Sequence, residues 1–372
     1  MKILYVTTIS NTINAFMVPH IKLLLEQGHQ VDIACNIDKS IDNELIEKGC
    51  KVFDVSFQRS PTSKENYTAY KKLKELILSE KYELVHTHTP IASACARLAC
   101  KKIKNVKVIY TAHGFHFFKK APLRNWLVYY PVERYLAKYT DVLITINKED
   151  YNRANRLLKA KDIKYIPGVG IDTKKYIEYN GTNKAEKRQE LGLLNETFTI
   201  LSVGELNKNK NHETVIRAIS NLGNKNINYL ICGSGSLHTY LEGLVKELGL
   251  EKQVKLLGYR NDINEICQAA DAFAFPSMRE GLGLAALEAM ASGLPIITSN
   301  VHGIVDYSID GVTGFACDPT DVEGFAKGID KLYKSKNDRE AMGKYNQDAV
   351  KVFDISNTNK VLKDIYEQLE VK

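Results

Sequence analysis

Long apolar runs are missing from this 372-residue sequence. No uninterrupted stretch reaches the roughly 20 apolar residues that a membrane-spanning helix needs, and the longest candidate, residues 281–297, contains Glu288. The apolar run after Lys2 covers residues 3–6 only, which is too short for a secretory signal and is typical of a buried strand. We therefore expect a cytoplasmic protein with neither a signal peptide nor a membrane span.

Cysteine pairs are also missing. The seven cysteines are odd in number, none forms a Cys-x-x-Cys motif, and most lie in apolar runs, where cysteine packs as a small hydrophobic residue. This pattern excludes a disulfide framework and a structural zinc site, and it indicates a reducing compartment.

The positive charge of the chain is distributed unevenly. Residues 1–170 contain 27 Lys and Arg against 16 Asp and Glu, whereas residues 171–372 contain 24 against 28. A solvated surface explains scattered lysines equally well, but a basic first half also suits an anionic partner such as a phospholipid surface or a lipid diphosphate. No nucleic-acid-binding motif accompanies the charge, so we expect no nucleic-acid partner.

Short β-branched runs alternate with amphipathic stretches along the chain, which predicts parallel, doubly wound sheets of the α/β class. The length suits two domains, and Pro167, Gly168 and Gly170 mark a turn between them, so we predict Rossmann-like domains at residues 1–170 and 171–372. A C-terminal helix is expected near residues 355–370; whether it packs back on the N-terminal domain stays open. The expected strands are residues 3–6, 31–34, 84–86, 106–111, 142–146 and 163–166, then 198–203, 227–232, 254–257, 272–275 and 296–298.

The most informative segment runs from residue 275 to residue 295. A predicted strand ends at Phe275, a loop carries Glu280, and a helix begins near Gly283 and carries Glu288. Glycine at a strand-to-helix turn lets backbone approach a ligand, and the free N–H groups of a helix start bind anions or hydroxyls. Glu280 can accept hydrogen bonds from sugar hydroxyls, and Glu288 from a ribose. An ordinary capped helix is the alternative, but a buried Glu is costly unless it is paired.

The spacing Glu280-x7-Glu288, followed by Ala-Met-Ala-Ser-Gly-Leu-Pro295, resembles the signature of the retaining glycosyltransferases with the GT-B fold, of the sucrose synthase and phosphatidylinositol mannosyltransferase kind. The resemblance continues over nearly the whole chain, at residues 110–114, 202–210, 232–235, 256–260 and 306–315. It implies two Rossmann-like domains that face a central cleft, with the acceptor on the N-terminal domain and the nucleotide-sugar on the C-terminal domain.

The N-terminal residues 1–14 and the segment 112–117 are similar to those of transferases that assemble bacterial capsules and exopolysaccharides. The resemblance implies a UDP-sugar donor and a saccharide acceptor on undecaprenyl diphosphate, at the inner face of the plasma membrane. Residues 115–130 mix basic and aromatic side chains, and we expect peripheral membrane contact through this basic N-terminal domain. The alternative is that these aromatics form core beneath a loop.

The resemblance implies three catalytic residues: Lys210 neutralises the donor diphosphate, Glu280 holds the sugar, and His113 touches it. By itself, a lysine in Asn-Lys-Asn-Lys-Asn would indicate a solvated loop. Glu205 stands where the family usually has an arginine. The second diphosphate partner therefore stays open between Lys208, Arg260, Arg279 and backbone N–H groups.

The donor-binding residues that the resemblance implies share small or apolar character, apart from one ribose-binding carboxylate: Gly204, Leu257, Gly258, Gly281, Leu282, Gly283, Leu284 and Glu288. On the acceptor side the family's Gly-Gly is replaced by the polar residues Ser10, Asn11, Thr12 and Asn14. The His86-x-His88 pair has no nearby carboxylate and poor spacing for a metal, so we expect no metal and no cofactor. The resemblance also implies a retaining mechanism, in which the acceptor attacks the face of the sugar that the leaving group vacates.

Two other functions stay open. A nucleotide-sugar epimerase of the same two-domain fold would convert its donor without an acceptor. A non-catalytic partner would bind a nucleotide-sugar and never release free nucleotide. The replacement of the family arginine by Glu205 is consistent with this hypothesis.

Overall fold

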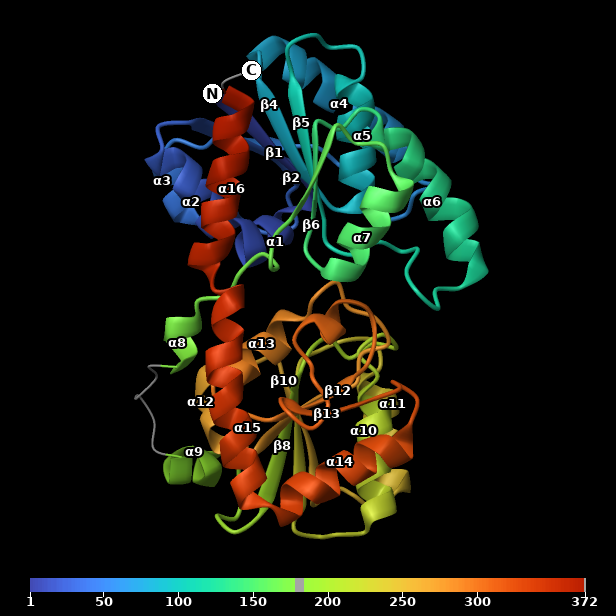
Figure 1. The fold of residues 1–372 in the computed structure, drawn as a ribbon, viewed down its shortest axis with the longest axis vertical. Coiled ribbons are helices and arrows are strands. Elements are labelled where there is room, and N and C mark those ends of the chain that lie inside the picture. The colour runs from blue at the N-terminus through green and yellow to red at the C-terminus, as the bar shows by residue number, and fades with distance from the viewer. Residues whose placement is uncertain (178–183, 371–372) are drawn as a thin grey trace. The chain divides into compact units, whose positions relative to one another are not determined.

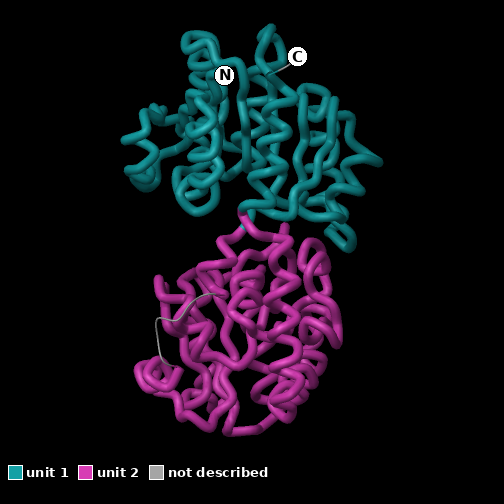
Figure 2. Tube along the Cα trace, turned by 60° about the vertical axis from the view of Figure 1, so that its left-hand side comes forward, with its two compact units in different colours: residues 1–170, 356–372 teal, residues 171–355 magenta. Residues whose placement is uncertain are grey.

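A computed structural model describes residues 1–177 and 184–370 and divides the chain into two compact units. Unit 1 comprises residues 1–170 and 356–372, and unit 2 comprises residues 171–355 (Figure 2). The boundary falls in the Pro- and Gly-containing turn near residue 170. The C-terminal segment, for which the pattern gives no docking site, belongs to unit 1.

Unit 1 is built on a seven-stranded sheet in the order β3-β2-β1-β4-β5-β6-β7, and every pairing in it is parallel. Strand β1 lies inside the sheet, where Ile3 pairs with Val31 on one side and with Leu84 on the other. The strands are β1 (Lys2–Ile9), β2 (Gln30–Asn36), β3 (Val52–Asp54), β4 (Leu84–His88), β5 (Lys107–Ala112), β6 (Val142–Thr145) and β7 (Asp162–Tyr165).

Helices connect these strands, as parallel pairing requires (Figure 1). They are α1 (Ser10–Thr12), the π-helical turn η1 (Ile13–Met17), α2 (Val18–Glu26), α3 (Asn43–Glu47), α4 (Glu65–Glu80), α5 (Pro90–Cys100), α6 (Leu123–Ala137) and α7 (Lys148–Leu157). The expected strands are all present. The sequence did not predict β3, a three-residue edge strand.

Unit 2 repeats the scheme with a six-stranded parallel sheet in the order β10-β9-β8-β11-β12-β13. Its strands are β8 (Phe198–Val203), β9 (Ile227–Cys232), β10 (Val254–Gly258), β11 (Ala272–Phe275), β12 (Ile296–Ser299) and β13 (Gly314–Cys317). The helical segments are α8 (Thr173–Ile177), α9 (Lys184–Glu190), α10 (His212–Leu222), α11 (His238–Glu247), α12 (Ile263–Ala269), α13 (Leu284–Ala291), η2 (His302–Asp306), α14 (Val322–Lys334), α15 (Lys336–Ala349) and η3 (Val350–Phe353). Both units are Rossmann-like α/β domains, as predicted.

The last helix, α16 (Ile355–Glu370), packs against the sheet of unit 1. Its Tyr366 is fully buried, and the hydroxyl lies 2.9 Å from that of Tyr5 on β1. Asn359 Oδ1 lies 2.8 Å from Nδ1 of His20 on α2. Polar contacts of this kind cannot be read from a helical period, which explains why the pattern left the docking site open.

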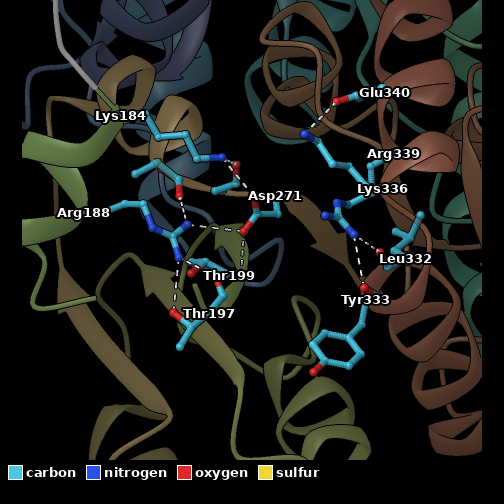
Figure 3. A network of polar contacts seen from close by, with 12 residues as sticks. Lys184, Arg188, Thr197, Thr199, Asp271, Leu332, Tyr333, Lys336, Arg339 and Glu340 are labelled. Atoms are coloured by element: carbon cyan, nitrogen blue, oxygen red, sulfur yellow. Dashed lines mark hydrogen bonds and ion pairs between the residues drawn. The ribbon is translucent and has the colours of Figure 1, made fainter. Parts of the chain in front are cut away.

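Arg188 fastens α9 to the rest of unit 2. Its guanidinium is almost fully buried and donates to the carbonyl oxygen of Ala269 at 2.9 Å and to the Asp271 carboxylate at 3.3 Å (Figure 3). The same carboxylate accepts from the N–H of Thr199 at 2.9 Å and pairs with Lys184. Because a buried charge must be paired, this network fixes the start of β8, the strand that leads into the candidate donor site.

All seven cysteines are free thiols, and six are buried. None forms a disulfide, as the sequence predicted. Among residues 1–177 and 184–370, no helix is both long and apolar enough to cross a membrane.

Candidate functional site

The candidate donor site lies at the carboxyl edge of the unit 2 sheet. There, β8 and β11 are neighbours although they are far apart in the chain, because the strand order reverses between them. Ligands of open α/β sheets bind at such a switch point. The segments that follow these two strands, residues 204–211 and 276–283, carry most of the residues expected on the donor side.

Asparagine side chains hold the first of these segments against the second. Asn209 donates to the carbonyl oxygen of Arg279 at 2.9 Å, and Asn211 donates to that of Pro276 at 3.1 Å. Asn211 adopts a left-handed backbone conformation with φ 54°, which asparagine tolerates better than most residues. The lysine between these asparagines, Lys210, is therefore held in place, unlike a side chain of a solvated loop.

Lys210 and Glu280 form the central ion pair of this site. The Nζ atom of Lys210 lies 2.6 Å from Oε1 of Glu280, and the two side chains are 22% and 14% exposed. The aliphatic part of Lys210 packs against Gly204, where an added Cβ would lie 3.2 Å from its Cδ and Cε atoms. A cation and a carboxylate thus share a half-buried position at the strand ends.

Residues 281–284 form the turn from β11 into α13. Gly283 has φ 98°, and a Cβ at this position would lie 2.5 Å from the ring of Phe275, so only glycine fits without rearrangement. The hydroxyl of Tyr307 donates to the carbonyl oxygen of Leu282 at 2.9 Å. The turn is thereby fixed while the first N–H groups of α13 lack partners within the helix, as at any helix start.

Glu288 lies on the second turn of α13 and is half-buried. Burial raises the pKa of its carboxyl group, and a hydrogen bond with Tyr176 and the charge of Lys175 act in the opposite direction. Tyr176 was not predicted as a partner of Glu288, because it belongs to no recognised motif of the sequence.

A pocket of about 290 Å³ opens at the ends of β8 and β9. Arg260 lines it, but its guanidinium is bound to Asp262 at 2.5 and 2.7 Å and to Glu190 at 2.9 Å. Lys208 is exposed and is not among the lining residues. The lining residues are Val203, Gly204, Glu205, Cys232, Gly233, Ser234, Tyr259, Arg260 and Ile263. Glu205, which stands where the resemblance expects an arginine, is therefore a lining residue of this pocket.

The expected donor-binding residues Leu257 and Gly258 end the edge strand β10, and both are half-buried. The carbonyl oxygen of Gly258 accepts from the N–H of Gly233 at 2.7 Å. An added Cβ on Gly233 would lie 1.9 Å from the carbonyl oxygen of Gly204. The backbones that follow β8, β9 and β10 thus come close together at the pocket.

In unit 1, His113 follows β5 and contacts the last residue of β4. Its Nε2 atom lies 3.0 Å from Nδ1 of His88, and burial lowers the pKa of His113 to about 4. Burial also lowers the pKa of His88, so both imidazoles are neutral near pH 7. His88 Nε2 is buried without a hydrogen-bond partner among the described residues. Because an unpaired buried N–H is costly, we assign the His88 proton to Nδ1, which donates to His113 and leaves the His113 proton on Nδ1.

Three of the four polar residues expected on the acceptor side have internal partners. Ser10 is fully buried and donates to Asp38 at 2.7 Å, and the N–H of Asn11 donates to the same carboxylate at 3.1 Å. Asn14 donates to the carbonyl oxygen of Ser40 at 2.8 Å. These residues therefore brace the segment after β2. Thr12 lines a pocket, which is described below.

Two family comparisons cover both units. Residues 2–147 match the family Glycosyl transferase 4-like, and residues 183–349 match the family Glycosyl transferases group 1. EpsD of Bacillus subtilis (strain 168), a protein assigned by name to the glycosyltransferases, is 35% identical over 98% of this chain and 96% of its own length. The chain belongs to the glycosyltransferases. The Glu-x7-Glu segment that suggested the family thus led to the correct assignment.

The chain is also similar to another named glycosyltransferase and to a solved structure. An Escherichia coli protein named UDP-Gal:alpha-D-GlcNAc-diphosphoundecaprenol alpha-1,3-galactosyltransferase is 30% identical over 85% of this chain and 83% of its own. The solved structure of Anabaena Alr3699/HepE in complex with UDP superposes with a TM-score of 0.82, at 21% identity, over 99% of this chain and all of that one. This glycosyltransferase therefore has the GT-B fold.

Proposed function

We propose that this glycosyltransferase transfers a hexose or N-acetylhexosamine from a UDP-sugar to a saccharide on undecaprenyl diphosphate, with retention of anomeric configuration, in capsule or exopolysaccharide assembly. The observation that carries the proposal is the contact of 2.6 Å between Lys210 and Glu280 at the switch point of unit 2. The UDP in the Alr3699/HepE structure and the lipid diphosphate in the name of the Escherichia coli relative support the donor and acceptor classes.

In this mechanism the bond between the sugar C1 and the diphosphate oxygen breaks while a bond forms between C1 and the acceptor oxygen, on the same face of the sugar. The acceptor proton passes to an oxygen of the leaving phosphate. The ammonium of Lys210 stabilises the charge that grows on the diphosphate, and a well-placed donor of this kind contributes about 3–4 kcal/mol. Glu280 accepts hydrogen bonds from sugar hydroxyls, and Glu288 accepts them from ribose.

We further propose that catalysis needs no metal, since Lys210 and the start of α13 supply the positive charge. The second diphosphate partner is then backbone N–H, Lys208 or Arg279, because the guanidinium of Arg260 is already bound to two carboxylates. In unit 1, His113 acts as a neutral imidazole that donates a hydrogen bond to the donor sugar or accepts one from it. The enzyme works at the inner face of the plasma membrane, where its lipid-linked acceptor resides.

Nucleotide release from a panel of UDP- and GDP-sugars tests this proposal. The assay is run with and without a lipid extract from a polysaccharide-producing bacterium, and with and without EDTA. We expect release from one UDP-sugar, stimulation by the extract, and full activity in EDTA. The anomeric configuration of the product, measured by NMR coupling constants, reports retention or inversion.

Each alternative function predicts a different result. Donor binding without release under any condition would favour a non-catalytic nucleotide-sugar-binding protein, consistent with Glu205 at the pocket wall. Conversion of the donor without an acceptor would favour an epimerase. Loss of activity in EDTA that added Mg²⁺ restores would contradict the metal-free mechanism.

A further inference from the structure

Helix α6 presents a row of large apolar side chains to solvent. Leu123 and Leu127 are 72% and 69% exposed, and Val128, Val132 and Tyr135 are about half exposed. In Figure 1 the helix lies at the outer edge of unit 1. Single exposed apolar residues are ordinary, whereas a contiguous group on one helix marks an interaction surface.

Basic residues lie on the same side of the helix. With about 100° between successive residues, Arg124, Arg134 and Lys138 fall within the half-turn that contains the exposed apolar side chains. All three are exposed. Glu133 is the only acidic residue between positions 119 and 138, and it is buried in an ion pair with Arg97 on α5. The exposed face of α6 therefore carries positive charge and no negative charge.

This combination favours a lipid surface over a protein partner. An amphipathic helix lies in the membrane interface when apolar side chains enter the acyl boundary and Lys and Arg reach anionic headgroups. We propose that the exposed face of α6, with Leu123, Leu127, Val128, Val132 and Tyr135 at its centre, docks this glycosyltransferase on an anionic phospholipid membrane. The 15-residue helix lies along the surface and does not cross it.

The inner side of α6 leads directly to a pocket. Tyr129 lines a cavity of about 290 Å³ at the carboxyl ends of β1 and β4, together with Thr8, Thr12 and Arg59. The ring of His116, another lining residue, stacks on Tyr129 with 4.4 Å between ring centroids. If the proposed lipid-linked acceptor is correct, docking through α6 brings this pocket to the membrane that holds the acceptor. Docking itself does not depend on that function.

The outer face of α6 can be changed without loss of the fold, because other residues hold the helix. Arg97 donates to both carboxylate oxygens of Glu133, at 2.8 and 3.1 Å. Trp126 and Tyr130 pack around the buried ring of Phe117. Substitutions at Leu127 or Arg124 touch none of these contacts.

Co-sedimentation with vesicles tests the docking surface. We expect the protein to bind vesicles of phosphatidylcholine mixed with phosphatidylglycerol, to bind phosphatidylcholine alone more weakly, and to lose binding as salt is raised. Leu127→Glu should weaken binding about tenfold or more, and Arg124→Gln about fivefold. Leu78→Glu is the matched control: Leu78 lies on α4 of the same unit, is 53% exposed, and should leave binding unchanged.

Three results would overturn the docking proposal. These are wild-type vesicle binding by Leu127→Glu, equal loss in the Leu78→Glu control, and a dimer that Leu127→Glu dissociates without any vesicle binding by the wild type. Transfer to a short-chain, water-soluble lipid-diphosphate saccharide separates docking from catalysis. Leu127→Glu should transfer to it as the wild type does. Transfer without vesicle binding overturns only the docking surface, and vesicle binding without transfer overturns only the proposed function.

Discussion

Replacement of Lys210 by alanine is the sharpest test of the donor site. In the free protein its ammonium lies 2.6 Å from Glu280, at a position where both side chains are largely shielded from water. A hydrogen bond between a charged donor and a phosphate contributes about 1.5–3 kcal/mol, which corresponds to roughly 10- to 150-fold in affinity. Part of this gain is offset because Glu280 already satisfies the ammonium, so we expect UDP affinity to fall by about tenfold.

The effect on the rate should be larger than the effect on binding. Negative charge on the diphosphate grows only as the glycosidic bond breaks, and loss of one donor to such a charge lowers kcat about 10²- to 10³-fold. Calorimetry with UDP and nucleotide release from the donor measure the two effects separately. Lys225→Ala is the matched control, because it removes the same charge at the opposite, amino-terminal end of β9. Unchanged UDP affinity and rate in Lys210→Ala would remove Lys210 from the diphosphate site.

Three further predictions concern the ion pair, the histidines and the anchor of α6. Glu280→Gln should lower turnover at least 100-fold while UDP binding, measured by calorimetry, is kept or strengthened, since Lys210 is then released; loss of UDP binding would refute the role of Glu280 at the sugar. Burial lowers the pKa of His113 to about 4, against about 6.5 when unfolded, so its contribution to stability is complete above pH 6.5 and is lost as the pH falls towards 4. His113→Gln should therefore flatten the decline of Tm over this range, and an unchanged slope would argue against a neutral buried imidazole. Arg97→Met should lower the free energy of unfolding in urea by about 3–5 kcal/mol because it leaves Glu133 buried and unpaired, and adding Glu133→Leu should recover most of this loss; no recovery would show that the pair does not act through buried charge.

The fold was predictable because its signal is local. The alternation of β-branched runs with helical periods can be seen in short stretches of sequence. It predicted eleven of the strands. The two that it missed, β3 (Val52–Asp54) and β13 (Gly314–Cys317), are three and four residues long and lie at sheet edges. Their pairing partners, β2 and β12, supply the order that the short segments cannot specify alone.

The candidate site was predictable only in part. Glu280 and Glu288 share one loop and one helix, so a single segment of sequence revealed both. The sequence could not show that Arg260 is bound to Asp262 and Glu190, nor that Ser10 is buried against Asp38. These pairings depend on which charged and polar side chains come together after folding, so they cannot be predicted from the periodicity of the sequence.

By itself, the sequence determined two Rossmann-like domains, the family, and a carboxylate, Glu280, in the loop that precedes α13. The tertiary structure decided which cation meets that carboxylate. Lys210 and Glu280 are 70 residues apart, and they come within 2.6 Å because β8 and β11 are neighbours in the sheet and both strands end at the same edge. Strand order depends on long-range packing of whole elements, so it, and the charge pairs that it creates, becomes fixed only when the chain folds.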